Sequence, residues 1–444
     1  MAFATLPPDS AQSKNNPLFP RQSAAAFFLV TGLFFFWGIP NNLNDVLIRQ
    51  FMKSFEITRL QAGLVQSAFY TGYFLFSVPA AMVMRRYGYK FGLVTGLLLY
   101  SFGTFLFYPA AQARSYSFFL LALFVIASGL GFLETGSNPL IAQIGDPESA
   151  VRRLNFSQAF NPLGAITGVL IGTLFIFSGI ELKVDDVARL KLAGTYDAYL
   201  QHETMRVITP YLVLGAVVLL WALLIVRTPF PSIAAGRRSD SEEPRGSYRE
   251  LLHYPHFLLA VVAQFCYVGA QVGTWSYFIQ YVQDYVHLPE KIAGYFLTGT
   301  LAGFGVGRFS ASHLMKTISA GKLMGGYALA NVGLVAIGVL FPGWVGLWAI
   351  FLTSFFMSVM FPTIFALGIR GLGHNTKPAA SLIVMAIIGG AVFTPAIGLV
   401  FQATKSMAIA MTVPLVCYLA VALYAFWGSK LAPFAEDPVP QGGD

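Results

Sequence analysis

Two carboxylates stand inside apolar stretches of this 444-residue chain, where a charged group is costly to keep. Asp45 ends the run 37–45 (WGIPNNLND), and Glu134 is the only acid in the apolar run 116–142. A carboxylate at membrane depth costs about 2.5–3.5 kcal/mol on insertion scales, so its retention indicates a use. Two structural alternatives stay open: Asp45 could pair with Arg49 one turn further on, and Glu134 could anchor a neighbouring helix by a hydrogen bond.

Amide side chains gather near the two acids. Asn41 lies one helical turn before Asp45, and Asn42 neighbours them on the same side. The apolar run 153–178 opens with amides at intervals of three, which places them on one helix face: Asn155, Gln158 and Asn161. An amide both donates and accepts hydrogen bonds, which suits a sugar hydroxyl. Helix-to-helix hydrogen bonding is the alternative for each of them.

A polar and aromatic stripe follows in the run 256–282. Its members recur at three, four and four residues: Gln264, Tyr267, Gln271 and Trp275. Sugar sites combine amides for the hydroxyls with an aromatic ring for the apolar sugar face. The stripe therefore predicts a sugar-binding surface, with an interfacial aromatic as the alternative for Trp275.

Proton transfer through the apolar region would have to use the two acids. The histidines fall in loops or at the ends of apolar runs: His202, His253, His256, His287, His313 and His374. Burial disfavours a charged carboxylate, so Asp45 and Glu134 could hold and release protons near neutral pH. We expect that protonation neutralises an acid and lets a loaded carrier change orientation.

Enzymatic chemistry finds no support in the sequence. The chain has no nucleotide-binding loop, nucleophile elbow or metal-ligand cluster, so we expect no catalytic residue, no cofactor and no metal site. Cys266 and Cys417 lie inside apolar runs and are interpreted as buried packing residues. The net charge of +8 comes from bases scattered through short loops, which indicates lipid headgroups rather than nucleic acid.

The elements that position these residues must be membrane-spanning helices. Only 11% of residues are charged and 56% are hydrophobic, whereas soluble proteins are roughly a quarter charged. A helix needs about 20 apolar residues to cross a bilayer. Twelve such runs occur, at 25–50, 59–84, 91–112, 116–142, 153–178, 208–227, 256–282, 291–315, 321–341, 345–371, 377–402 and 407–428.

A charged linker divides these runs six and six, which predicts an all-α membrane protein of two pseudo-symmetric six-helix bundles. Basic residues concentrate in alternate loops, which favours cytoplasmic placement of both termini, and we expect no removable signal peptide. The predicted divisions are a cytoplasmic tail (1–24), a first bundle (25–227), a cytoplasmic linker (228–255), a second bundle (256–428) and a cytoplasmic tail (429–444).

Weak internal symmetry supports the two halves. The basic loop 85–90 after the second run has a counterpart after the eighth, to which we assign Arg308, Lys316 and Lys322. Glycines at intervals of four occur at 164–172 in the fifth run and at 299–307 in the eighth. Such faces let another backbone approach closely, so they predict a tight seam between the halves, or ordinary packing within each half.

Four segments resemble the fucose–galactose–glucose:proton symporter family of the major facilitator superfamily. They are 41–45 (NNLND), 133–135 (LET) with 138–139 (NP), 263–271 (AQFCYVGAQ) and 362–365 (PTIF), and the similarity covers roughly residues 27–427. The resemblance implies that Asp45 couples proton movement and that Glu134 contacts the sugar. It also implies amide ligands at Asn42 and Gln158, with Gln271 and Trp275 in the same cavity by position, while Asn161 remains a predicted sugar ligand from its place on the amide face.

Several residues next to the matching segments differ from those expected in the family, and these differences bear on which sugar is carried. They lie beside the cavity, at Pro40, 136–137, 272–274 and Phe361. The resemblance implies a monomeric importer of the bacterial cytoplasmic membrane that carries L-fucose or a related hexose with a proton. A sodium-coupled hexose carrier and, less favoured by the polar cavity, a drug:proton antiporter are the alternatives.

Overall fold

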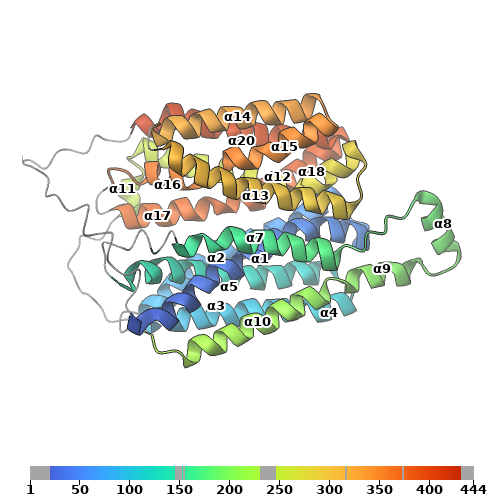
Figure 1. Ribbon diagram of the computed structural model, residues 1–444, viewed down its shortest axis with the longest axis horizontal. Helices are drawn as coiled ribbons and strands as arrows, with labels where there is room; N and C mark the ends of the chain where they lie inside the picture. Colours follow the sequence, from blue (N-terminus) through green and yellow to red (C-terminus); the bar gives the residue numbers. More distant parts are fainter. Residues whose placement is uncertain are drawn as a thin grey trace, which may run out of the picture.

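The computed structural model describes residues 21–145, 153, 156–230, 247–315, 318–372 and 375–431, and the elements assigned within these ranges are all helices. The helices run side by side as two layers, with α1–α10 below and α12–α20 above in Figure 1. This arrangement matches the predicted all-α fold of two helical bundles. Asn155 and most of the predicted linker lie outside the described residues.

The first bundle holds the helices before residue 230. Its spans are α1 (Ala24–Phe55), α2 (Arg59–Tyr87), α3 (Tyr89–Phe105) continued by α4 (Phe107–Gln112), α5 (Tyr116–Gln143), α7 (Phe160–Ile171) continued by a π-helical turn (Gly172–Ile176), and α10 (Ile208–Arg227). Two further helices, α8 (Val184–Leu192) and α9 (Tyr196–Met205), project beyond the bundle at one end (Figure 1). We call this end the loop end and the opposite end, which carries the linker, the linker end.

The second bundle begins after the short helix α11 (Tyr248–Leu251). Its spans are α12 (Pro255–Val286), α13 (Glu290–Leu314), α14 (Ala320–Leu340), α15 (Trp344–Met357) with α16 (Met360–Gly368), α17 (Thr376–Met385) with α18 (Gly389–Thr404), and α19 (Met407–Ala410) with α20 (Thr412–Phe426). Within the described residues, eleven helices are long and apolar enough to cross a membrane. The remaining predicted run, 291–315, is the eighth along the chain and forms α13, whose glycines and Arg308 lower its mean hydropathy.

Prolines inside the spans free backbone carbonyls, and side chains from neighbouring helices donate to them. A proline cannot donate to the carbonyl four residues earlier. Pro40 frees the carbonyl of Phe36, which accepts from the Tyr100 hydroxyl at 3.0 Å. Pro395 frees the carbonyl of Ala391, which accepts from Ser67 of the other bundle at 2.7 Å.

The glycine faces pack within each bundle, so their predicted place at the seam between the halves is wrong. A methyl group at Gly164 or Gly168 of α7 would collide with backbone carbonyls of α1. On α13, a methyl group at Gly307 would collide with the Phe355 carbonyl of α15. A methyl group at Gly303 would have no described atom within 4 Å. Spacing alone identifies a close helix contact but does not identify its partner.

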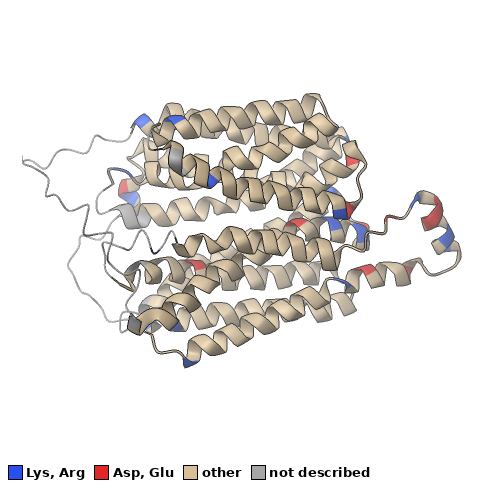
Figure 2. Ribbon diagram, viewed as in Figure 1, with Lys and Arg blue, Asp and Glu red and all other residues tan. Residues whose placement is uncertain are grey.

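Ion pairs join the two bundles at the loop end. Arg59 at the start of α2 makes a bidentate pair with Asp284 of α12, at 2.5 and 2.6 Å. Lys53 of α1 lies 3.2 Å from Glu290 of α13 and 3.2 Å from Glu203 of α9. Figure 2 shows that charged residues gather toward the two ends of the helices. The Arg59–Asp284 and Lys53–Glu290 pairs join the two bundles at the loop end.

Candidate functional site

A cavity of about 200 Å³ lies between the bundles and is lined from both of them. The first bundle contributes side chains of α1, α2, α5 and α7, and the second contributes α12, α13 and α16. A second cavity of about 550 Å³ adjoins it and shares Trp37, Glu134, Asn161, Arg308 and Phe361. The second cavity extends toward the linker end, where Met315 and Ala320 line it. The site is therefore reached from the linker end while the loop end is closed.

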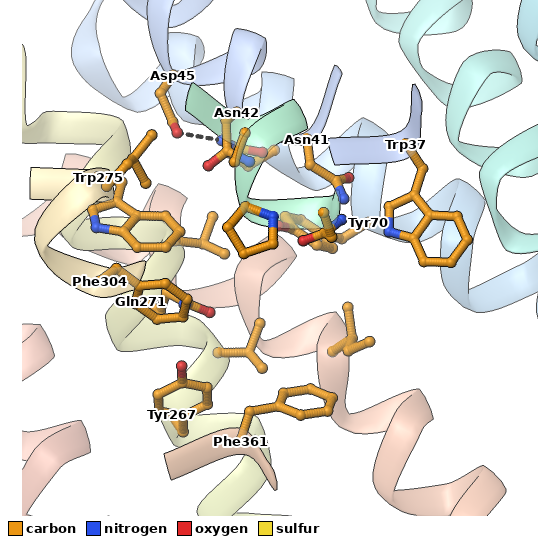
Figure 3. A pocket seen from close by; sticks show the side chains of 18 of the residues that line it. Trp37, Asn41, Asn42, Asp45, Tyr70, Tyr267, Gln271, Trp275, Phe304 and Phe361 are labelled. Carbon is orange, nitrogen blue, oxygen red and sulfur yellow. Dashed lines mark hydrogen bonds between the residues drawn. The ribbon is translucent and has the colours of Figure 1, made fainter. Parts of the chain in front are cut away.

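The structure brings seven of the predicted site residues to these two cavities. Asn42, Asp45, Glu134, Asn161, Gln271 and Trp275 line the smaller cavity. Gln158 lines the larger one, together with Glu134 and Asn161. Figure 3 shows Asn41, Asn42 and Asp45 of α1 on one side of the smaller cavity, with Trp275 and Gln271 of α12 facing them. Their roles in binding or coupling stay predictions.

Asp45 is almost completely buried between the bundles. Its exposed fraction is 2%, and its Oδ1 accepts hydrogen bonds from Gln66 Nε2 and Ser276 Oγ, each at 2.9 Å. Arg49 instead approaches Glu181 and Glu290, so the predicted alternative of an Asp45–Arg49 pair is wrong. No cation among the described residues lies within 4.0 Å of the Asp45 carboxyl. The group is a candidate proton acceptor rather than half of an ion pair.

Glu134 lies on α5 where the two cavities meet. It is half-buried and lines both cavities, with Tyr73 of α2 beside it. Within the described part of the chain, no cation lies within 4.0 Å of its carboxyl. A cavity-facing carboxylate of this kind can accept hydrogen bonds from a polar ligand, or take up a proton itself.

The amides keep hydrogen-bonding capacity for a ligand. Asn42 Nδ2 donates to the Gly38 carbonyl at 3.1 Å, and Asn161 Nδ2 donates to the Phe34 carbonyl at 3.3 Å. Gln158 Nε2 donates to Asn138 Oδ1 at 3.3 Å. Each amide offers two donor hydrogens and a carbonyl oxygen, so one such bond leaves most of its capacity unused.

The polar stripe on α12 divides into two parts. Tyr267, Gln271 and Trp275 line the cavity, whereas Gln264 is fully buried away from it, which corrects its predicted place in the stripe. Trp275 is 9% exposed and its Nε1 donates to Ser354 Oγ at 2.9 Å. This burial excludes the interfacial alternative for Trp275. Its ring meets Phe304 edge-to-face with 5.4 Å between centroids.

Arg308 lines both cavities. The prediction that it lies in a loop after the eighth run is therefore wrong. Its Nε donates to the Ser358 carbonyl, which Pro362 leaves free, at 3.4 Å. Its guanidinium stands 5.1 Å from the Phe304 ring centroid. Apart from Lys291 at its first position, Arg308 is the only lysine or arginine in the apolar run 291–315, and that signal could have identified it. Four aromatic residues of the lining were also missed, namely Trp37, Tyr70, Tyr73 and Phe304, whereas Phe361 lines the cavity beside which it was predicted.

Comparison with known proteins identifies the family. Residues 24–381 match the profile of the Major Facilitator Superfamily. The chain belongs to this superfamily. It is 42% identical to the L-fucose-proton symporter of Escherichia coli K12 over 411 residues, which cover 91% of this chain and 93% of that protein. It is 33% identical to a glucose/galactose transporter of Brucella abortus over 94% of this chain and 98% of that one.

Solved structures give the same family. A crystal structure of the transporter FucP in the outward conformation matches with a TM-score of 0.68 and 41% identity, covering 92% of this chain and 99% of that one. In this chain, the ion pairs close the loop end and the larger cavity extends to the linker end.

Proposed function

We propose that this transporter imports a monosaccharide, L-fucose or a related hexose, together with a proton across a bacterial cytoplasmic membrane. The observation that carries the proposal is a pair of acids, Asp45 and Glu134, that line one cavity between the bundles and have no cation partner among the described residues. The relatives whose names specify sugar transport cover more than nine-tenths of the chain.

The chemistry of the cavity suits a hexose. One side presents polar groups from the first bundle, among them Asn42, Glu134 and Asn161. The other side presents aromatic rings from the second bundle, among them Trp275 and Phe304. A hexose carries hydroxyls at its edge and apolar C–H groups on its ring faces, so it can contact both sides at once. A sugar that contacts both bundles also favours their closure around it.

Coupling follows from the burial of Asp45. Taking a charged group out of water costs several kcal/mol per ion, whereas a neutral carboxyl avoids most of this cost. Closure of the loop end places Asp45 between the bundles with two hydrogen bonds and, among the residues that the structure describes, no cation within 4.0 Å. We assign to Asp45 the proton that makes this closure favourable, and to Glu134 a direct contact with the sugar.

The proposed orientation rests on the basic residues, which concentrate in the loops at the linker end. We place the linker end and both termini in the cytoplasm, and the loop end with α8 and α9 outside. The described state then opens inward, because the larger cavity reaches the linker end. Alternating access would open the loop end by separating the ion pairs Arg59–Asp284 and Lys53–Glu290. We expect the monomer to be sufficient, since one chain encloses the cavity.

The test is uptake of a panel of radiolabelled sugars in proteoliposomes, with and without an imposed pH gradient. We expect accumulation of L-fucose or a related hexose when the interior is alkaline, and collapse of accumulation with a protonophore. Accumulation that follows a sodium gradient and ignores the protonophore would instead assign sodium as the coupling ion. Absence of flux for every sugar of the panel would refute the proposed function.

A further inference from the structure

The hydrogen bonds around Asp45 cross from one bundle to the other. We propose that Ser276 of α12 and Gln66 of α2 are positioning residues that let Asp45 release its proton toward the linker end while the loop end stays closed. This inference rests on the proposed function, because it specifies how the coupling acid completes its cycle. Nothing in the sequence motifs marks Ser276 or Gln66, which stand outside the strings that resemble the family.

The three side chains form a closed triangle of hydrogen bonds. Gln66 Nε2 lies 2.9 Å from Asp45 Oδ1 and 2.9 Å from Ser276 Oγ, and Ser276 Oγ lies 2.9 Å from Asp45 Oδ1. All three residues are buried, with exposed fractions of 2% for Asp45, 1% for Gln66 and 0% for Ser276. Asp45 and Gln66 belong to the first bundle and Ser276 to the second, so the triangle exists only while the bundles are together here.

The triangle supports the charged form of Asp45. A serine hydroxyl and an amide N–H both donate to the same carboxylate oxygen, and donors to a charged acceptor stabilise the charge. Without these donors, a carboxylate in this dry position would hold its proton more tightly. The proton must leave here, because the loop end is closed and the cavity that Asp45 lines adjoins the one reaching the linker end.

Gln66 can form a hydrogen bond to Asp45 in both protonation states of that acid. Its Oε1 is buried without a hydrogen-bond partner while its Nε2 faces Asp45. Rotation of the amide by half a turn would turn the carbonyl toward a protonated Asp45 and accept its O–H. The proton then passes from the Asp45 O–H to water in the cavity, which leaves the carboxylate held by Ser276 and Gln66.

Other titratable or charged groups near Asp45 must be considered, since they could shift its titration. Those that share its cavity come from four helices: Tyr70 and Tyr73 of α2, Glu134 of α5, Tyr267 of α12 and Arg308 of α13. Arg49 on α1 is engaged with Glu181 and Glu290. Only Gln66 and Ser276 are within hydrogen-bond distance of the Asp45 carboxyl among the described residues.

The experiment compares net sugar uptake with sugar exchange as the internal pH of proteoliposomes is varied. Net uptake requires the empty carrier to release its proton inside, whereas exchange of labelled for unlabelled sugar does not. For Ser276→Ala we expect exchange close to that of the unmodified protein. We expect the internal pH of half-maximal net uptake to rise by about one unit, the effect of removing one hydrogen bond to a charged group. Gln66→Leu should shift it in the same direction.

The matched control is Thr274→Val, which removes another buried hydroxyl from the same helix outside the cavity. This variant should keep the original pH profile. An unshifted profile for Ser276→Ala, or an equal loss of exchange and net uptake at every internal pH, would overturn the role of Ser276. If the unmodified protein shows no dependence of uptake on pH, the proposed proton coupling fails instead, so the two failures are distinguishable.

Discussion

Neutralising Asp284 should open the loop end, because its carboxylate makes the bidentate contact that joins α12 to α2. The side chains of Arg59 and Asp284 are 14% and 29% exposed, so this pair lies between a surface pair and a buried one. Exposed pairs contribute up to about 1 kcal/mol, whereas removing one partner of a buried pair costs about 3–5 kcal/mol. We therefore expect Asp284→Asn to cost the closed state about 1–2 kcal/mol, which lowers the ratio of closed to open molecules about 5–30-fold.

The assay is a distance measurement between spin labels at the loop end, one on each bundle. Ser117 of α5 and Ala403 of α18 are exposed there and can be replaced by cysteine after Cys266 and Cys417 are changed to serine. Asp284→Asn should shift the distance distribution toward longer values. The Asp284→Asn variant keeps the Arg59 guanidinium stacked on Phe401, 4.0 Å from the ring centroid. A change in the distance distribution therefore reports the loss of the ion pair.

The control is Asp197→Asn, which removes an ion pair at the same end but within the first bundle. Asp197 lies 3.3 Å from Arg114 and is 90% exposed, so its loss should leave the distribution unchanged. Identical distributions for Asp284→Asn, the control and the unmodified protein would refute the reasoning that this pair holds the bundles closed.

Three further predictions concern the site and its support. Glu134→Gln should weaken sugar binding about 10–100-fold, because a hydrogen bond to a charged acceptor usually contributes that much. An unchanged affinity in an equilibrium binding assay would remove Glu134 from the site. Trp275→Ala should also weaken sugar binding, as measured by calorimetry, because its ring lines the cavity. The control Gln264→Leu on the same helix should leave the affinity unchanged, because Gln264 lies outside the cavity. Gly164→Ala should lower the melting temperature in detergent by several degrees, since its methyl meets the Phe35 carbonyl of α1, and an equal melting temperature would contradict that packing.

Much of the fold follows from the sequence because bilayer thickness fixes the length of an apolar helix. The predicted runs correspond to the observed spans, including α13, which carries Arg308 and several glycines. The helices α8 and α9 were not predicted, since their polar residues 184–205 carry no membrane signal. For the glycine faces, packing within each bundle is confirmed and the seam between the halves is wrong, and the sequence left both open because a spacing along one helix contains no information about the helix it meets.

The acids and amides of the site were predictable because a polar side chain in an apolar run must face the protein interior or a watery cavity. The aromatic lining was not, since Tyr70 and Phe304 look like ordinary packing residues in sequence. Gln264 and Gln271 share a stripe, yet only Gln271 reaches the cavity, because helix rotation is set by tertiary packing. Ser276 gave no signal at all, because its importance depends on a contact with a helix of the other bundle.

The central claim is that a proton on Asp45 couples sugar movement to the pH gradient. Measuring accumulation and counterflow of the same labelled sugar in proteoliposomes containing Asp45→Asn tests it most directly. The uncharged amide mimics the protonated acid, so we expect counterflow to persist while accumulation against a gradient disappears. Accumulation equal to that of the unmodified protein would contradict the account.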